Sequence, residues 1–290
     1  MKRDLQNPDL NSLLPDVQVD RRGFVAACIA AGFAVTAEPI LAQAIKTPMD
    51  GLDGGDTKIG EIPAYYAVPK GGGKHAVVLV VAEIWGLHEH IKDVVRRVAK
   101  AGYFAVANEP YFRIGELWKM EDIKQVMAGA NQLSDEQALK DVDAVVGWAG
   151  KNSRANTGKL GVTGFCRGGR MVWMYTAHQK KIDAAVAWYG GLSPAQPAIS
   201  TTPFDIVDKL NAPVLGLYGG ADQGIPQEQV EKLRAALKES SNKNAQRSDI
   251  YLYPDMPHGF NADYRPSYRK EAAEDGWKRM LAWFKQHGVA

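Results

Sequence analysis

Cysteine is scarce in this sequence: only Cys28 and Cys166 occur among its 290 residues. If Cys28 is removed with a leader segment, the remaining chain cannot form an intramolecular disulfide. An excess of one charge is also missing, because 35 basic and 33 acidic residues leave a formal net charge of +2. No basic stripe interleaved with aromatic residues occurs, and we therefore expect no nucleic-acid partner.

Signatures of bound cofactors are missing too. The sequence has no glycine-rich phosphate loop and no histidine and cysteine spacing typical of a metal site. The glycine runs at residues 54–55 and 71–73 are typical of turns. We therefore expect no cofactor and no metal. A chain of this length, 46% apolar and without internal repeats, is predicted to fold as one enzyme-sized domain.

The apolar stretch Phe24–Ala37 is too short to cross a bilayer, which takes about 20 residues. It follows the pair Arg21-Arg22 and precedes Ala42-Gln43-Ala44. Paired arginines, a weakly apolar segment and an A-x-A-like cleavage site are typical of a twin-arginine export signal. We expect residues 1–44 to be this signal, read by the twin-arginine machinery, and the mature protein to be periplasmic without a stable membrane anchor. A buried amphipathic N-terminal helix is the alternative.

Residues 45–57 are expected to be an N-terminal extension and residues 58–290 one domain in which strands and helices alternate. Strands are predicted at Ile59–Val68, Ala76–Ala82, Phe104–Asn108, Leu160–Thr163, Ala184–Trp188, Val214–Tyr218 and Asp249–Tyr253. Helices are predicted at His90–Ala101, Asp135–Lys151, Gly169–His178, Gln227–Glu239 and Ser267–His287. Such alternation predicts an α/β fold, with a mostly parallel sheet and helices on both faces.

One predicted turn contains a candidate nucleophile. The segment Gly164-Phe165-Cys166-Arg167-Gly168-Gly169 lies between a predicted strand and a predicted helix. This order, with glycines around a central nucleophile, is typical of the nucleophile elbow of α/β-hydrolases, G-x-Nuc-x-G. The pattern predicts an α/β-hydrolase fold with Cys166 as nucleophile. The alternative is a buried cysteine that packs as a small apolar residue.

The two partners that such a nucleophile needs follow in the required order, first an acid and then a histidine. Asp222 follows an apolar run that ends in Gly219-Gly220, and His258 lies on a loop before the last predicted helix. Each alone has a simpler interpretation: Asp222 could cap a helix, and His258 could be a solvated loop residue. Their order after Cys166 favours a catalytic triad.

Glu83 ends another apolar run, at the same edge of the predicted sheet. A desolvated carboxylate near a thiol could hold or take a proton. A salt bridge to a structural arginine is the alternative. The backbone N–H groups of Ile84 and Arg167 have the sequence positions of an oxyanion hole, one after the nucleophile and one after an early strand.

Together these motifs resemble the dienelactone hydrolase (carboxymethylenebutenolidase) family over residue 58 to the C-terminus. The matching segments are Glu83-Ile84-Trp85-Gly86, Pro110-Tyr111-Phe112-Arg113, Gly164-Phe165-Cys166-Arg167-Gly168-Gly169, Gly219-Gly220-Ala221-Asp222 and His258-Gly259-Phe260. The resemblance implies a Cys166–His258–Asp222 triad in which Glu83 contacts the cysteine. It also implies that Arg113 binds a substrate carboxylate and that Tyr189 lies near the pocket, with Trp85 a further candidate for substrate binding.

Several positions depart from the pattern of the family enzyme that acts on dienelactone. Gly259 stands where that enzyme has a serine, and Ala82 where it has a glutamine. Arg167 puts a cation after the nucleophile, where that enzyme has an apolar residue. The second carboxylate-binding arginine has no secure counterpart, and Arg265 is the nearest candidate. These departures leave hydrolase chemistry intact and put the particular lactone in doubt.

The sequence thus predicts a hydrolase that cleaves a lactone or carboxylic ester of a small molecule, with a preference for anionic substrates, through a thioester on Cys166. A monomer is expected. A general carboxylesterase of the same fold is one alternative. A non-catalytic ligand-binding or thiol-sensing relative is the other, although disulfide chemistry needs a second thiol.

Overall fold

The computed structural model describes residues 45–194 and 201–290, so the predicted leader, residues 1–44, lies outside the described residues. Within them, one sheet has the strand order β1-β2-β4-β3-β5-β6-β7-β8. The strands are β1 Leu52–Ile59, β2 Ile62–Pro69, β3 His75–Val81, β4 Phe104–Asn108, β5 Ala155–Phe165, β6 Ala184–Trp188, β7 Val214–Gly219 and β8 Asp249–Tyr253. The pairs β1–β2 and β2–β4 are antiparallel, and every later pair in this order is parallel.

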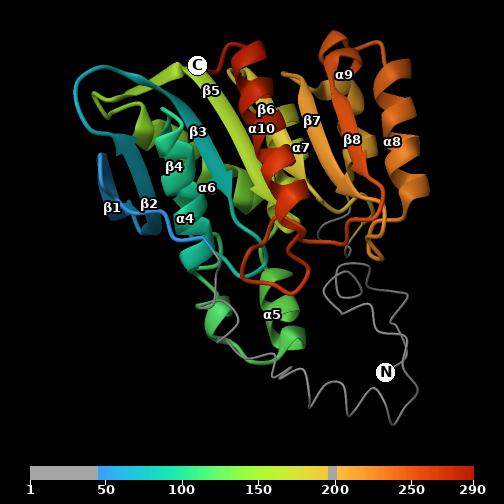
Figure 1. The fold of residues 1–290 in the computed structure, drawn as a ribbon, viewed down its shortest axis with the longest axis horizontal. Coiled ribbons are helices and arrows are strands. Elements are labelled where there is room, and N and C mark those ends of the chain that lie inside the picture. Colours follow the sequence, from blue (N-terminus) through green and yellow to red (C-terminus); the bar gives the residue numbers. More distant parts are fainter. Residues whose placement is uncertain (1–44, 195–200) are drawn as a thin grey trace.

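The helices cover both faces of this sheet (Figure 1). They are α4 Glu89–Lys100, α5 Ile123–Ala130, α6 Asp135–Ala149, α7 Arg167–His178, α8 Gln227–Glu239, α9 Lys243–Arg247 and α10 Lys270–Gln286, with short 3-10 segments at Leu117–Lys119 and Pro203–Lys209. Helices α4 and α10 together border one hollow and so share a face. Helix α7 packs against α6 and against β5 and β6. None of the helices in the described ranges combines the length and the apolar character that a membrane span needs.

The predicted α/β-hydrolase architecture is confirmed. The central strands show the burial and the pairing that this fold requires. In β3, Val77–Val80 is fully buried, as a strand covered on both faces requires. Strand β3 pairs with β4 on one side and β5 on the other. Because the chain runs the same way in β3 to β8, the loops that follow these strands meet at one edge of the sheet. All candidate triad residues come from those loops.

The N-terminal part of the sheet differs from the prediction. The single strand predicted at Ile59–Val68 is wrong in its bounds, because a hairpin turns there at Gly60, whose φ is 60°. Its first strand, β1, begins at Leu52, inside the stretch expected to be an extension. The segment Leu52–Ile59 contains Gly-Gly and alternating exposed polar residues, as an edge strand tolerates, so it lacks the apolar run that marks the inner strands. Helices α5 and α9 were also not predicted.

Candidate active site

Cys166 lies between the last residue of β5 and the first residue of α7. Its backbone has φ 54° and ψ −118°, and its N–H donates to the Trp188 carbonyl at 3.0 Å. A positive φ is rare for a residue with a side chain and persists only where the surrounding packing holds it. The side chain is buried. The structure therefore has the strained turn that the elbow motif predicts.

The glycines of the elbow are required by close backbone contact. A Cβ atom at Gly168 would stand 2.3 Å from the Val81 carbonyl oxygen, and one at Gly164 would stand 2.6 Å from the Gly168 carbonyl oxygen. Neither position can carry a side chain without moving the backbone. This packing presses the start of α7 against the end of β3, two residues before Glu83. The amides of Arg167 and Ile84 thus come from two segments in direct contact.

His258 and Asp222 form the second half of the predicted triad. His258 Nδ1 donates to Asp222 Oδ2 at 2.7 Å, and both side chains are buried. The other Asp222 oxygen, Oδ1, accepts from the N–H groups of Gly224 at 2.9 Å and Ile225 at 3.2 Å. The aspartate is therefore fixed by its own loop and in turn fixes the imidazole ring. The alternative of a solvated His258 is excluded.

The pKa of His258 depends on Cys166 as well as on Asp222. Burial alone would lower the pKa of His258, but the Asp222 carboxylate and the Cys166 sulfur outweigh burial and raise this pKa to about 10. A histidine held beside a nucleophilic sulfur can serve as its proton partner. The Nε2 atom of His258 has no hydrogen-bond partner within residues 45–194 and 201–290. It is free to exchange a proton with a reacting group.

Glu83 is nearly fully buried, with 1% of its surface exposed. Its Oε2 accepts a hydrogen bond from the Tyr264 hydroxyl. Burial raises the pKa of Tyr264 well above its usual value, so this hydroxyl stays a donor. The second oxygen, Oε1, has no hydrogen-bond partner in the described part of the chain. Glu83 therefore holds one spare acceptor beside the nucleophile.

Arg265 balances this carboxylate. Burial would lower the pKa of Arg265, but Tyr264, Glu83 and Cys166 together raise it, so the guanidinium keeps its charge. Its Nη1 is buried and has no hydrogen-bond partner among the described residues. Gly259 has φ 70°, and a Cβ there would stand 2.7 Å from Nη1. The glycine after the catalytic histidine thus leaves room for this arginine.

Tyr189 and Trp85 are both buried. The Tyr189 ring meets the His258 ring edge to face, with centroids 5.0 Å apart, and its backbone φ is 37°. Burial raises the pKa of Tyr189 well above its usual value. Neither the Tyr189 hydroxyl nor the Trp85 indole N–H has a hydrogen-bond partner in the described ranges. Tyr189 thus lies against the ring of His258.

Arg113 has a different neighbour from the one that the sequence suggested. Its guanidinium forms two hydrogen bonds with the carboxylate of Asp141 on α6, at 2.7 and 2.9 Å, and lies 4.1 Å above the Phe112 ring. Asp141 is buried whereas Arg113 is half exposed. Because both terminal nitrogens of Arg113 already donate to Asp141, they are not available to bind a second carboxylate in the same bidentate way. Arg113 therefore has a carboxylate of the protein itself, on α6, as its partner.

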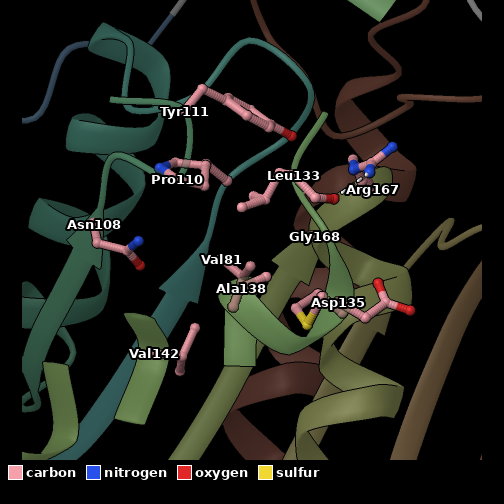
Figure 2. A pocket seen from close by; sticks show the side chains of 12 residues that line it. Val81, Asn108, Pro110, Tyr111, Leu133, Asp135, Ala138, Val142, Arg167 and Gly168 are labelled. Carbon is pink, nitrogen blue, oxygen red and sulfur yellow. Dashed lines mark hydrogen bonds between the residues drawn. The ribbon is translucent and has the colours of Figure 1, made fainter. Parts of the chain in front are cut away.

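A narrow pocket of about 30 Å³ lies beside the elbow, room for about one water molecule (Figure 2). Residues from four segments line it: Val81, Ala82, Asn108, Pro110, Tyr111, Leu133, Asp135, Ala138, Val142, Arg167, Gly168 and Met171. Leu133 and Arg167 lie side by side in Figure 2, and the Arg167 side chain donates to Asn131 Oδ1 at 2.9 Å and to the Leu133 carbonyl at 3.4 Å. The cation of Arg167 therefore ties the elbow to the loop after α5.

Sequence reasoning missed three aromatic side chains near Glu83. Tyr264 contacts the rings of His88 and His90, with centroids 5.0 and 5.1 Å away. His90 Nδ1 donates to Asp263 Oδ1 at 2.6 Å. Burial, followed by the charges of His90 and Arg265, lowers the pKa of His88 well below its usual value. The only sequence signal was that His88 and His90 follow Glu83 by a few residues and that Tyr264 follows His258.

Comparison with known proteins agrees with this geometry. The model of the dienelactone hydrolase family matches residues 62–288. The chain belongs to the dienelactone hydrolase family. It is therefore a hydrolase of the ester and lactone class, and the expected family, fold and enzyme class are confirmed.

Three relatives show how far the similarity extends. A "Putative carboxymethylenebutenolidase" of Methylorubrum extorquens is 46% identical over 289 residues, which cover 97% of this chain and 98% of that protein. A protein of the same name from Escherichia coli strain K12 is 48% identical over 264 residues, 89% of this chain and 96% of that one. The crystal structure of a "Putative Dienelactone Hydrolase" from Klebsiella pneumoniae has 46% identity and a TM-score of 0.77, and the match covers 81% of this chain and 99% of that one.

Proposed function

We propose that the protein hydrolyses a carboxylic ester or lactone by transferring the acyl group to Cys166. One observation carries this proposal: His258 is held by Asp222 at 2.7 Å and interacts with the sulfur of Cys166, which stands on a strained elbow. Nucleophile, base and orienting acid in this order are the elements of a catalytic triad.

In the first half of the reaction, the Cys166 sulfur attacks the carbonyl carbon. A C–S bond forms and the electron pair of the C=O bond moves to oxygen. The N–H groups of Ile84 and Arg167 stabilise this oxyanion, and one such donor is typically worth about 3 kcal/mol. As the C–O bond breaks, the leaving alkoxide takes the Nε2 proton of His258. A thioester remains.

In the second half, His258 takes a proton from water and the resulting hydroxide attacks the thioester carbonyl. The C–S bond breaks, and the acid leaves while the sulfur retains the electron pair. Asp222 keeps the imidazole ring oriented and stabilises its charged form in both halves. Water activation is as necessary as the first attack, because an unhydrolysed thioester would stop turnover.

For the substrate, we propose a small molecule with a carboxylate near the scissile bond, bound by Arg265. This guanidinium keeps its charge, and its buried Nη1 is not used by any described residue. A substrate carboxylate could take this unused Nη1 as its partner, while Glu83 keeps Oε1 unused by any described residue. A second candidate is a general carboxylesterase, which the pairing of Arg113 with Asp141 favours, because that pairing takes away the carboxylate-binding arginine expected from the sequence.

The test of the nucleophile is Cys166→Ala. We expect turnover of 4-nitrophenyl acetate to fall to background while the melting temperature stays within a few degrees of wild type. Rapid quenching of the wild type with a slow ester should trap an acyl adduct on the peptide that contains Cys166, detectable by mass spectrometry. Turnover that survives in the alanine variant, or an adduct on another residue, would refute the assignment.

We also propose that the chain is exported by the twin-arginine machinery, loses residues 1–44 and acts in the periplasm as a monomer. Arg21-Arg22 and the A-x-A-like site at residues 42–44 support export, and the origin of every site residue in one chain supports a monomer. Fractionation should find the processed protein in the periplasm. Replacing both arginines by lysine should leave the full chain in the cytoplasm, and unchanged export of that variant would count against the proposal.

A further inference from the structure

The first described residues are bound to two buried carboxylates. The Ile45 nitrogen donates to Asp263 Oδ2 at 2.8 Å. Two residues later, the Thr47 nitrogen donates to Asp93 Oδ1 at 2.5 Å, and its hydroxyl donates to Oδ2 at 3.3 Å. Both aspartate side chains are fully buried. The start of the described chain is therefore held by charged groups of the domain interior.

These carboxylates belong to an ion-pair cluster. Its members are Glu89, His90, Asp93, Arg96, Arg97 and Asp263. Arg97 joins the two aspartates, at 2.5 Å from Asp93 and 3.1 Å from Asp263, and the buried His90 ring lies 2.6 Å from the other Asp263 oxygen. Glu89 is half exposed, so the buried carboxylates of the cluster are Asp93 and Asp263. A buried carboxylate is costly unless charged partners surround it, so a further positive group at Asp263 would stabilise the cluster.

Removal of the predicted leader would place a positive group beside Asp263. In the full chain, the Ile45 nitrogen is a neutral amide. Cleavage after Ala44 would turn the same atom, already 2.8 Å from Asp263 Oδ2, into an α-ammonium group. The hydrogen bond to Asp263 would then join two charged groups, so the attraction of opposite charges would be added to it.

We propose that this cleavage creates a buried ion pair between the Ile45 α-ammonium and Asp263, and that the pair fixes the active-site loop from His258 to Tyr268. The inference rests on the export and cleavage proposed above. It makes leader removal a maturation step for the enzyme as well as a release step.

The path from this pair to the site is short. Asp263 precedes Tyr264, whose hydroxyl donates to Glu83. The same aspartate holds the His90 ring, which packs against Tyr264 at 5.1 Å and against Phe165 at 6.5 Å, the residue before the nucleophile. A shift of the Asp263 carboxylate would therefore move groups on both sides of the thiol.

The pair should also depend on pH in a defined direction. An ordinary α-amino group has a pKa of about 7.7–8.0, and the Asp263 carboxylate should raise it, while the nearby Arg97 opposes that rise. Other charged or titratable groups also border the hollow at Ile45 or contact Asp263: Lys100, Glu274, Lys278, Tyr268 and His90. Because the folded pKa is raised, the added stability is present below about pH 8 and is lost as the pH rises through the folded pKa.

The experiment compares three forms of the protein. One chain begins at Ile45 with a free α-amine, a second carries Gly-Ser before Ile45, and the third is the full chain. At pH 7 we expect the first form to melt at least about 3 °C above the second. We also expect it to turn over 4-nitrophenyl acetate several-fold faster, and to react with iodoacetamide at a different rate. The melting difference should close by about pH 10.

Asp263→Asn provides the matched control, since the difference between the first two forms should vanish in that background. If this variant does not fold, the pH dependence of the melting difference between the first two forms still tests the ion pair. Equal melting and turnover of the first two forms would overturn the inference, and so would an exported chain that begins at another residue. Absent esterase activity in every form, with the melting difference intact, would count against the proposed function and would support the ion pair.

Discussion

Glu83 follows β3 and Glu109 follows the neighbouring strand β4, so two buried carboxylates stand at the same edge of the sheet. Both Glu109 oxygens are used, because they accept from the Leu87 and Tyr111 N–H groups at 2.7 and 2.9 Å. Glu83 accepts from the Tyr264 hydroxyl and keeps Oε1 unused by any described residue. Burial alone therefore does not separate a structural carboxylate from one available for chemistry, whereas the unused acceptor does.

The packing around Glu109 supports a structural role. A Cβ atom at Gly86 would stand 2.3 Å from Glu109 Oε1, so the carboxylate fills the space under the loop that follows β3. Burial raises the pKa of Glu109, and its two amide donors only partly oppose this rise. Glu109 thus fixes the loop that carries Glu83, at some electrostatic cost.

Substitution of Asp222 should give the largest effect in this comparison of carboxylates with used and unused oxygens. Its oxygens are all used, like those of Glu109, yet one of them holds the catalytic histidine. We expect Asp222→Asn to lower kcat for 4-nitrophenyl acetate by about 10³–10⁴-fold, because the amide cannot keep the imidazole in its tautomer or stabilise its charge. Circular dichroism checks that the variant is folded. A loss of less than tenfold in a folded variant would mean that Asp222 is structural like Glu109.

A matched pair of substitutions addresses the two glutamates directly. Glu83→Gln should lower turnover by about 10²-fold with little change in stability, because the amide oxygen can still accept from Tyr264. Glu109→Gln should place an amide NH₂ against a backbone N–H and lower the free energy of unfolding by about 1–3 kcal/mol. Its turnover should stay near wild type.

Steady-state kinetics and urea unfolding of both variants measure these effects. Two results would contradict the comparison. One is a Glu83→Gln variant that loses stability but keeps its turnover per folded molecule. The other is a Glu109→Gln variant that keeps its stability but loses turnover.

Two arginines show the same difference between a side chain that is fully paired and one that keeps an unused atom. Arg113 is paired with Asp141, whereas Arg265 keeps Nη1 unused among the described residues. We expect Arg265→Met to reduce the preference for anionic over neutral esters by about tenfold, as the loss of one charge-assisted hydrogen bond allows. Arg113→Met should leave the preference unchanged and lower stability. If the wild type shows no anionic preference, the enzyme is a general carboxylesterase.

The smallest expected effect concerns pH. The pKa of His258 is raised to about 10 in the folded state, mainly by Asp222 against the effect of burial. This raised pKa stabilises the fold fully below about pH 6.5, the ordinary value for histidine, and the contribution is lost as the pH rises towards 10. Urea unfolding of wild type and Asp222→Asn from pH 6 to 10 should show a stability difference that shrinks with pH. A constant difference would contradict the raised pKa.

Much of the fold could be predicted from local signals. The bounds of β4, β6, β8 and α8 match the predicted segments, because each is an apolar or periodic run between turn residues. Strand β1 could not be recognised, since an edge strand with Gly-Gly and polar side chains has no such run. Its pairing with β2 depends on a hairpin whose turn, at Gly60, carries only a weak signal.

The sequence by itself determined the elbow and the order of its partners, because a strand, a tight glycine turn and a helix are encoded within a few neighbouring residues. Only the tertiary structure decided which distant groups pair: Arg113 with Asp141, Tyr264 with Glu83, and the Ile45 nitrogen with Asp263. Such contacts join segments that lie far apart in the sequence and that only the folded chain brings together. Charge and burial at these contacts are properties of the assembled segments, and no single segment of the sequence contains them.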